Sequence, residues 1–106
     1  MENVYSQAKI FHFRDKLSSL MDKEVTPPIH VRLKPMNRCN HRCFYCCYRN
    51  SNLYLNELFK EKDMIPREKM MEIVRDLVEM GVKAVTFTGG GEPLIYPYIA
   101  ETVSYL

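Results

Sequence analysis

The residues with the clearest chemical potential are the cysteines, all four of which lie between Cys39 and Cys47. Three of them, Cys39, Cys43 and Cys46, are spaced at steps of four and three residues. In a loop that curls, this spacing directs three sulfur atoms toward one centre. Thiols this close in sequence cannot link distant parts of a fold, so the pattern favours a metal site in a reducing compartment over structural disulfides.

The number of ligands in this group narrows the kind of metal site. A structural zinc ion takes four protein ligands, commonly as two separated CxxC pairs, whereas this chain has one compact group. His41 or Cys47 would have to complete a zinc site; otherwise Cys47 is a spare or packed thiol. An iron–sulfur cluster held by three cysteines keeps one iron free for a small molecule, while clusters used only for electron transfer are normally held by four.

A second motif lies at residues 88–93, which read Thr-Gly-Gly-Gly-Glu-Pro. It directly follows a β-branched and aromatic run that is typical of a strand. Glycines allow a backbone to approach a ligand closely and to adopt positive φ. Taken alone, the motif indicates a plain turn after a strand, and its pairing with the cysteines is what favours a cofactor site.

Together the two motifs resemble those of the radical S-adenosylmethionine (radical SAM) superfamily. The first match is CxxxCxxC with an aromatic residue, Tyr45, before the last cysteine, placed directly after a strand. The second is the glycine motif at the end of the next strand, which is similar to the methionine-binding motif of that family. The resemblance spans roughly residues 29–97.

The resemblance implies a cofactor site with two halves. Cys39, Cys43 and Cys46 would ligate a [4Fe-4S] cluster, whose remaining iron binds the amino and carboxylate groups of S-adenosyl-L-methionine. Tyr45 would lie against the adenine end, and ordinary core packing is the alternative for its ring. The pocket for the methionyl amino group would be lined by Gly89, Gly90, Gly91 and Glu92.

The resemblance also implies the chemistry. One electron reduces the cluster, the bound cofactor is cleaved, and the resulting 5′-deoxyadenosyl radical abstracts hydrogen from a substrate that the sequence does not identify. The electron would come from a reduced donor of the flavodoxin or ferredoxin type. No acidic residue occurs between Glu24 and Glu57, so the cysteines lie in a cationic zone that would ease reduction and attract an acidic donor. Within this zone, His41, Arg42 and Arg49 are predicted to be solvated surface.

The elements that must position these motifs follow from hydrophobic periodicity. Apolar residues at three- and four-residue steps predict an amphipathic helix over residues 5–22 that packs on another element. Alternating apolar and polar residues predict a short strand at 29–34, which Pro35 ends. Residues 51–64 permit either helical turns or a loop.

In the second half of the chain, one apolar stripe with Pro66 at its start and Gly81 as its C-terminal cap predicts a helix over residues 66–80. A strand at 84–88 follows, and another helix is predicted to begin at Pro97, with Ile99, Val103 and Leu106 on its apolar face. Two consecutive strand-to-helix units predict an α/β fold with parallel strands and right-handed crossovers.

Length limits the domain organisation, because 106 residues with 46% hydrophobic content form one small core. We expect an N-terminal helix and linker at 1–26 and a radical SAM core at 27–106, with a cluster loop at 36–50. The resemblance implies the first two βα units of a partial (β/α) TIM-like barrel, whose units take about 30 residues each. We therefore expect a truncated fragment that is inactive alone and has an exposed strand edge.

No apolar run reaches the ~20 residues of a membrane-spanning helix, and the N-terminus lacks a secretory signal pattern, so we expect a cytoplasmic protein. A different class of function also fits the cysteines. It is a small zinc- or iron–sulfur-binding module whose basic loop contacts an acidic partner, such as RNA, without catalysis. Metal content separates the two interpretations, because iron with sulfide favours the enzyme and one zinc ion favours the module.

Overall fold

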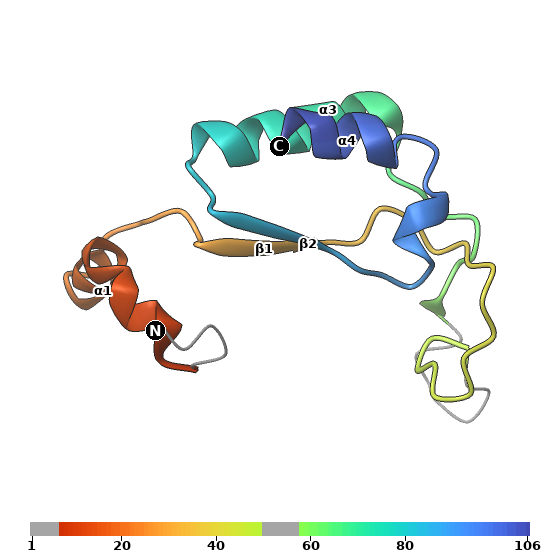
Figure 1. The fold of residues 1–106 in the computed structure, drawn as a ribbon, viewed down its shortest axis with the longest axis horizontal. Coiled ribbons are helices and arrows are strands. Elements are labelled where there is room, and N and C mark those ends of the chain that lie inside the picture. The colour runs from red at the N-terminus through yellow and green to blue at the C-terminus, as the bar shows by residue number, and fades with distance from the viewer. Residues whose placement is uncertain (1–6, 50–57) are drawn as a thin grey trace, which may run out of the picture.

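The structure is a computed structural model that describes residues 7–49 and 58–106. It is a small α/β fold in which helices cover one face of a two-stranded parallel sheet (Figure 1). None of the helices in these two ranges is long and apolar enough to cross a bilayer. In chain order the elements are the 3-10 helix η1 (Gln7–His12), α1 (Arg14–Met21), β1 (His30–Leu33), α3 (Arg67–Glu79), β2 (Ala84–Phe87), the 3-10 helix η2 (Pro93–Ile95) and α4 (Ile99–Tyr105).

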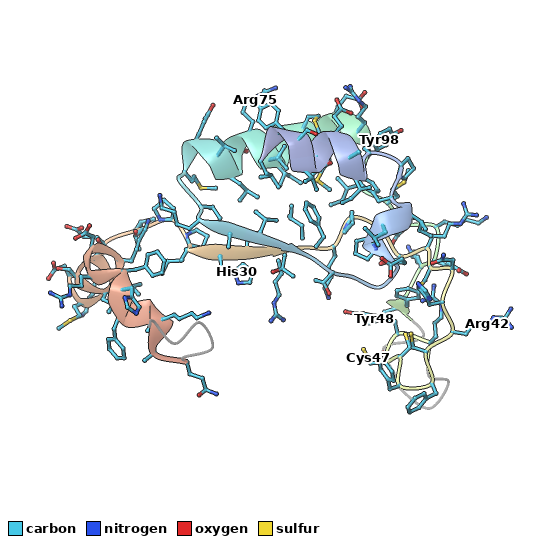
Figure 2. All side chains as sticks on the ribbon, viewed as in Figure 1. His30, Arg42, Cys47, Tyr48, Arg75 and Tyr98 are labelled. Atoms are coloured by element: carbon cyan, nitrogen blue, oxygen red, sulfur yellow. The ribbon has the colours of Figure 1, made fainter. Side chains whose placement is uncertain are left out.

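The two strands pair in parallel, as the order of elements predicts. Their register runs from His30 opposite Ala84 to Leu33 opposite Phe87. Helices α3 and α4 lie side by side over one face, whereas His30 projects from the other face (Figures 1 and 2). The described residues form this sheet alone, so the barrel that the resemblance implies is not present in them.

The core lies between the sheet and the two helices that cover it. Val85 and Phe87 of β2 are partly buried and pack against this core. Leu33 of β1 is buried, as the alternating pattern predicts, while the polar residues of that strand are exposed. The buried apolar residues of this core are Leu33, Met36, Met70, Val74, Leu77 and Tyr96.

Helix α3 begins and ends within one residue of the predicted boundaries. Pro66 is its N-cap and Met80 its C-cap, so the helical residues are Arg67 to Glu79. Gly81 follows with a φ of 72°, the left-handed conformation that glycine adopts at low cost after a helix. The two strong local signals, proline before the helix and glycine after it, therefore determined its length.

The N-terminal segment departs from its prediction. Residues 5 and 6 lie outside the described residues, and the rest forms η1 and α1, separated at Phe13, instead of one continuous helix. No residue of either element is buried, and Leu20 and Met21 are 58% and 83% exposed. The predicted packing is therefore wrong for this part of the chain, because periodicity identifies an apolar side of a helix but not a surface that covers it (Figure 1).

Helix α4 begins two residues after Pro97, and its predicted apolar face is covered only in part. Thr102 is fully buried, and its hydroxyl donates to the backbone carbonyl of Tyr98 at 2.7 Å. Of the predicted apolar face, Ile99 is partly buried and packs against the core, whereas Val103 and Leu106 are 55% and 45% exposed. The helix is oriented by its contact with α3, so the apolar residues at its free side stay uncovered among the described residues.

Tyr96 provides a test of the core. Its ring is 1% exposed, and its hydroxyl donates to the Ile65 carbonyl at 2.8 Å. We expect Tyr96→Phe to lower the free energy of unfolding by about 1–2 kcal/mol, because the substitution leaves a part-buried carbonyl without its donor. Tyr98→Phe is the matched control, since the Tyr98 hydroxyl makes no hydrogen bond within the described ranges. Urea unfolding of both variants measures the difference in the free energy of unfolding. Equal losses of stability in the two variants would contradict the prediction.

Candidate functional site

The two predicted motifs meet beyond the carboxyl ends of the paired strands. The cysteine loop, residues 39–49, follows β1, and the glycine loop, residues 88–92, follows β2. Because the strands are parallel, both loops leave the sheet at the same end (Figure 1). Together they line a hollow of about 260 Å³, to which all four cysteines and residues 89–92 contribute.

Backbone hydrogen bonds hold the glycine loop against the residues that precede the first cysteine. The N–H of Gly91 donates to the carbonyl of Met36, and the N–H of Glu92 donates to that of Arg38, each at 3.1 Å. This pairing continues the β1–β2 contact past the ends of the strands. It brings the glycine loop directly beside the start of the cysteine loop.

The structural reason for the glycines differs in part from the predicted one. A Cβ on Gly91 would overlap the backbone carbonyl of Arg38, and a Cβ on Gly90 would overlap the Phe59 ring. Neither Gly90 nor Gly91 has a positive φ. At Gly91 the absence of a side chain is therefore required by backbone packing, whereas a side chain at Gly90 would have to displace the Phe59 and Asn37 side chains.

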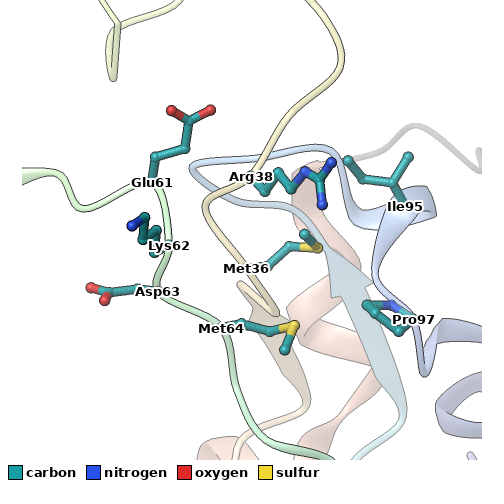
Figure 3. A pocket seen from close by; sticks show the side chains of 8 residues that line it. All are labelled: Met36, Arg38, Glu61, Lys62, Asp63, Met64, Ile95 and Pro97. Atoms are coloured by element: carbon teal, nitrogen blue, oxygen red, sulfur yellow. The ribbon is translucent and has the colours of Figure 1, made fainter.

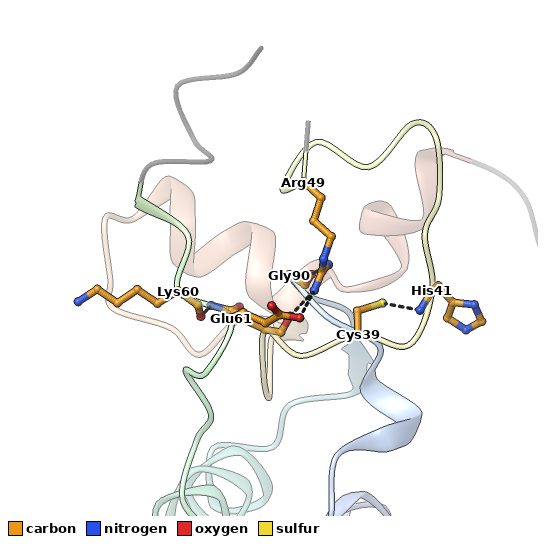
Figure 4. A network of polar contacts seen from close by, with 7 residues as sticks. Cys39, His41, Arg49, Lys60, Glu61 and Gly90 are labelled. Carbon is orange, nitrogen blue, oxygen red and sulfur yellow. Dashed lines mark hydrogen bonds and ion pairs between the residues drawn. The ribbon is translucent and has the colours of Figure 1, made fainter. Parts of the chain in front are cut away.

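The cysteine thiols differ in exposure. Cys39 and Cys46 are partly buried, whereas Cys43 and Cys47 are exposed, and all four are free. The Sγ of Cys39 accepts a hydrogen bond from the N–H of His41 at 3.4 Å (Figure 4). Hydrogen bonds from the Tyr48 backbone and from Arg49 lower the pKa of the Cys46 thiol, which favours the thiolate, the form that ligates metals.

The arrangement of the thiols bears on the kind of metal group that fits. Among the described residues, no three His, Cys, Asp or Glu side chains converge closely enough to hold a single metal ion. The four cysteines instead line a hollow together with residues 89–92 of the glycine loop. Three thiols from one compact loop suit an iron–sulfur cluster with one open iron, whereas a structural zinc site takes four protein ligands.

Two other predicted residues border the same hollow. Tyr45 is 75% exposed, so the alternative of core packing is wrong for its ring. The ring contacts that of Phe44 edge to face, with 5.1 Å between the ring centres. The Glu92 carboxylate accepts from the Leu94 N–H at 3.0 Å, and its other oxygen lies 3.6 Å from Nε2 of His41. Glu92 thus presents negative charge beside the glycine loop.

Sequence reasoning missed Arg49, which was predicted to be solvated surface. Its guanidinium donates to the carbonyls of Gly90 and Asn37, each at 3.1 Å (Figure 4). His41 and Arg42 are exposed, as predicted, and Arg42 points away from the loop (Figure 2). No local signal distinguishes these three cations, because the partners of Arg49 come from other parts of the sequence.

Two further hollows adjoin this region. One of about 430 Å³ lies on the other side of the glycine loop, at the end of β2, and shares Gly89, Gly91 and Glu92 with the first. Another, of about 580 Å³, is lined by Met36 and Met64 together with charged side chains (Figure 3). It contains none of the predicted site residues, so size alone does not indicate the site.

The comparisons with known proteins agree with the two motifs. The model of the Radical SAM superfamily matches residues 33–106. The GTP 3′,8-cyclase of Microcystis aeruginosa is 31% identical over 75 residues, which cover 70% of this chain and 22% of that protein. The GTP 3′,8-cyclase of Chlorobaculum tepidum is 35% identical over 74 residues, covering 70% of this chain and 20% of that protein.

A relative with a different name also matches. The S-adenosylmethionine-dependent nucleotide dehydratase of Flammeovirga pacifica is 35% identical over 65 residues, covering 61% of this chain and 21% of that protein. No solved structure matches the chain. The chain therefore spans about a fifth of the length of these curated relatives.

Proposed function

This chain belongs to the radical SAM superfamily, and we propose that its cysteine loop and glycine loop form the cluster and cofactor site of a radical SAM enzyme. Membership of the family implies S-adenosylmethionine cleavage with an iron–sulfur cluster. The observation that carries the proposal is the hollow that the four cysteines and the glycine loop line together. The non-catalytic zinc module has no comparable support, because the family match extends over both motifs.

We propose that Cys39, Cys43 and Cys46 hold a [4Fe-4S] cluster. When bound, this group supplies the electron that cleaves S-adenosyl-L-methionine, and the radical released then takes hydrogen from the substrate. The chain itself provides thiolates, of which Cys46 is favoured by the donors beside it. Cys47 lines the same hollow and is exposed, and we assign it no ligand role.

The glycine loop would hold the methionyl end of the cofactor. The Glu92 carboxylate borders the hollow and would attract the methionyl ammonium group. Gly90 and Gly91 bring main-chain atoms to the lining of the hollow. The exposed ring of Tyr45, at the tip of the cysteine loop, would stack on the adenine.

The relatives' names suggest the substrate class. One is named for GTP and another for nucleotides, so we propose that the enzyme formed by this site and further barrel strands acts on a nucleotide. Three exposed cations, Arg32, Lys34 and Arg38, precede the cysteine loop in the sequence and suit a phosphate-bearing molecule. A reduced flavodoxin or ferredoxin would supply electrons through the same cationic zone.

Anaerobic reconstitution with iron and sulfide tests the proposal. We expect a brown protein with about four irons per chain and little zinc. With dithionite and S-adenosylmethionine, we expect slow, uncoupled formation of 5′-deoxyadenosine, measured by chromatography, because two strands cannot enclose the cofactor in a dry site. A colourless protein that binds one zinc ion would contradict the proposal and support the alternative module.

A further inference from the structure

Arg49 lies at the junction between the cysteine loop and the glycine loop. Its two guanidinium hydrogen bonds end on main-chain carbonyls of separate segments, Gly90 after β2 and Asn37 after β1. A weaker contact of 3.4 Å reaches the exposed carboxylate of Glu61, and the guanidinium lies 5.4 Å from the centre of the Phe59 ring (Figure 4). The side chain is 27% exposed, and its two bonds to the main-chain carbonyls are part-buried, whereas the contact with Glu61 is exposed.

The backbone of Arg49 is connected to the last predicted ligand. Its N–H donates to the carbonyl of Cys46 at 3.4 Å, and the N–H of Cys46 donates to the carbonyl of Cys43 at 3.1 Å. A turn that contains Cys46 therefore ends on Arg49. A shift of the Cys46 backbone moves Arg49 with it, and the guanidinium bonds transfer that shift to the glycine loop.

The receiving end of this connection has little freedom to move. Gly90 is buried, and the space beside it is filled by Phe59 and Asn37. Phe59 is itself held by the Tyr48 ring, with 5.4 Å between ring centres. Because a planar guanidinium can donate to two carbonyls in fixed directions, whereas a lysine ammonium is a point charge, the geometry depends on arginine.

We propose that Arg49 is a positioning residue that couples the cysteine loop to the glycine loop, so that occupation of the cysteines orders the backbone that receives the cofactor. The inference rests on the proposed function, because it assumes that metal binds the cysteine loop. Arg49 does not touch the reacting atoms in this scheme. It sets the position of the glycine loop relative to Cys46.

Hydrogen exchange measures this coupling directly. The amides of Gly91 and Glu92 are hydrogen-bonded within the structure, so their exchange reports opening of the glycine loop. The variants are Arg49→Met and Arg49→Lys, with Arg42→Met as control, since Arg42 is an exposed arginine on the same loop. Each protein is measured without metal and after anaerobic loading with iron and sulfide, and iron per chain is determined in parallel.

Without metal, we expect the Gly91 and Glu92 amides to exchange about tenfold faster in Arg49→Met than in the control, and about threefold faster in Arg49→Lys. Amides of α3 should be unchanged, which separates positioning from a general loss of stability. After iron loading, the glycine loop should be protected in the original protein and in Arg42→Met. In Arg49→Met it should gain no protection even though the iron content is equal.

Two results would overturn the inference. One is exchange in metal-free Arg49→Met that equals the control, and the other is iron-dependent protection that persists in that variant. Failure of the proposed function gives a different result, namely no iron uptake by the original protein. In that case the metal-free measurements still decide whether Arg49 holds the two loops together.

Discussion

Replacement of Cys39, Cys43 or Cys46 by alanine should nearly abolish iron uptake during anaerobic reconstitution, whereas Cys47→Ala should retain it. In the proposed site each of the first three residues would supply one of only three protein thiolates, so removal of any one would leave two. The family spacing selects these three, and the structure places all of them around one hollow. Iron and sulfide per chain, together with the visible absorption of the cluster, measure the result.

Cys47→Ala is a demanding control because Cys47 lines the same hollow and, like Cys43, is exposed. Exposure and proximity therefore do not distinguish the two thiols, and only the spacing does. Loss of iron in Cys47→Ala with retention in Cys43→Ala would transfer the ligand role to Cys47. Retention of iron in all four single variants would remove the cluster assignment altogether.

Gly91→Ala should destabilise the chain more than Gly81→Ala. The new Cβ would overlap the carbonyl of Arg38, and it would lie 2.6 Å from the carbonyl carbon. These are backbone atoms held by the Glu92 hydrogen bond, so no flexible side chain can move aside. We expect a loss of about 3 kcal/mol in the free energy of unfolding, measured in urea, because overpacking against a fixed neighbour is costly.

Gly81→Ala separates this steric effect from backbone conformation. Gly81 has a φ of 72°, but a Cβ there would meet nothing within 4 Å. The cost of alanine at Gly81 is therefore that of the left-handed conformation alone, about 1 kcal/mol. If Gly91→Ala proves no less stable than Gly81→Ala, the glycine loop can withdraw from Arg38, and its close packing is not a requirement.

The packing around Gly90 limits what a bulky substitution there can show. A side chain at Gly90 would displace the Phe59 and Asn37 side chains. Arg49 donates to the backbone carbonyls of both Asn37 and Gly90, so its contacts would be disturbed as well. Loss of S-adenosylmethionine binding in such a variant would therefore not by itself show that the glycine loop forms the methionine pocket. Cysteine variants and the Arg49 series give cleaner tests, since they leave the glycine loop sequence intact.

The sequence alone determined the features that depend on neighbours along the chain. Pro66 and Gly81 punctuate α3, and the apolar stripe between them places Met70 and Val74 in the core. Alternation and β-branching predicted both strands, and the order of elements predicted their parallel pairing. The cysteine spacing and the glycine motif likewise indicated the family, because both are local patterns whose residue types have few other uses in combination.

Only the tertiary structure decided the features that depend on which distant segment lies opposite. Arg49 has its role because Gly90 and Asn37 meet beside it, and neither is near it in sequence. The same reason explains why Gly91 must lack a side chain, since the obstacle is the Arg38 backbone. It also explains why the apolar stripe of α1 remains uncovered: periodicity gives an element its apolar side, but burial requires a second surface, and the fold determines where that surface lies.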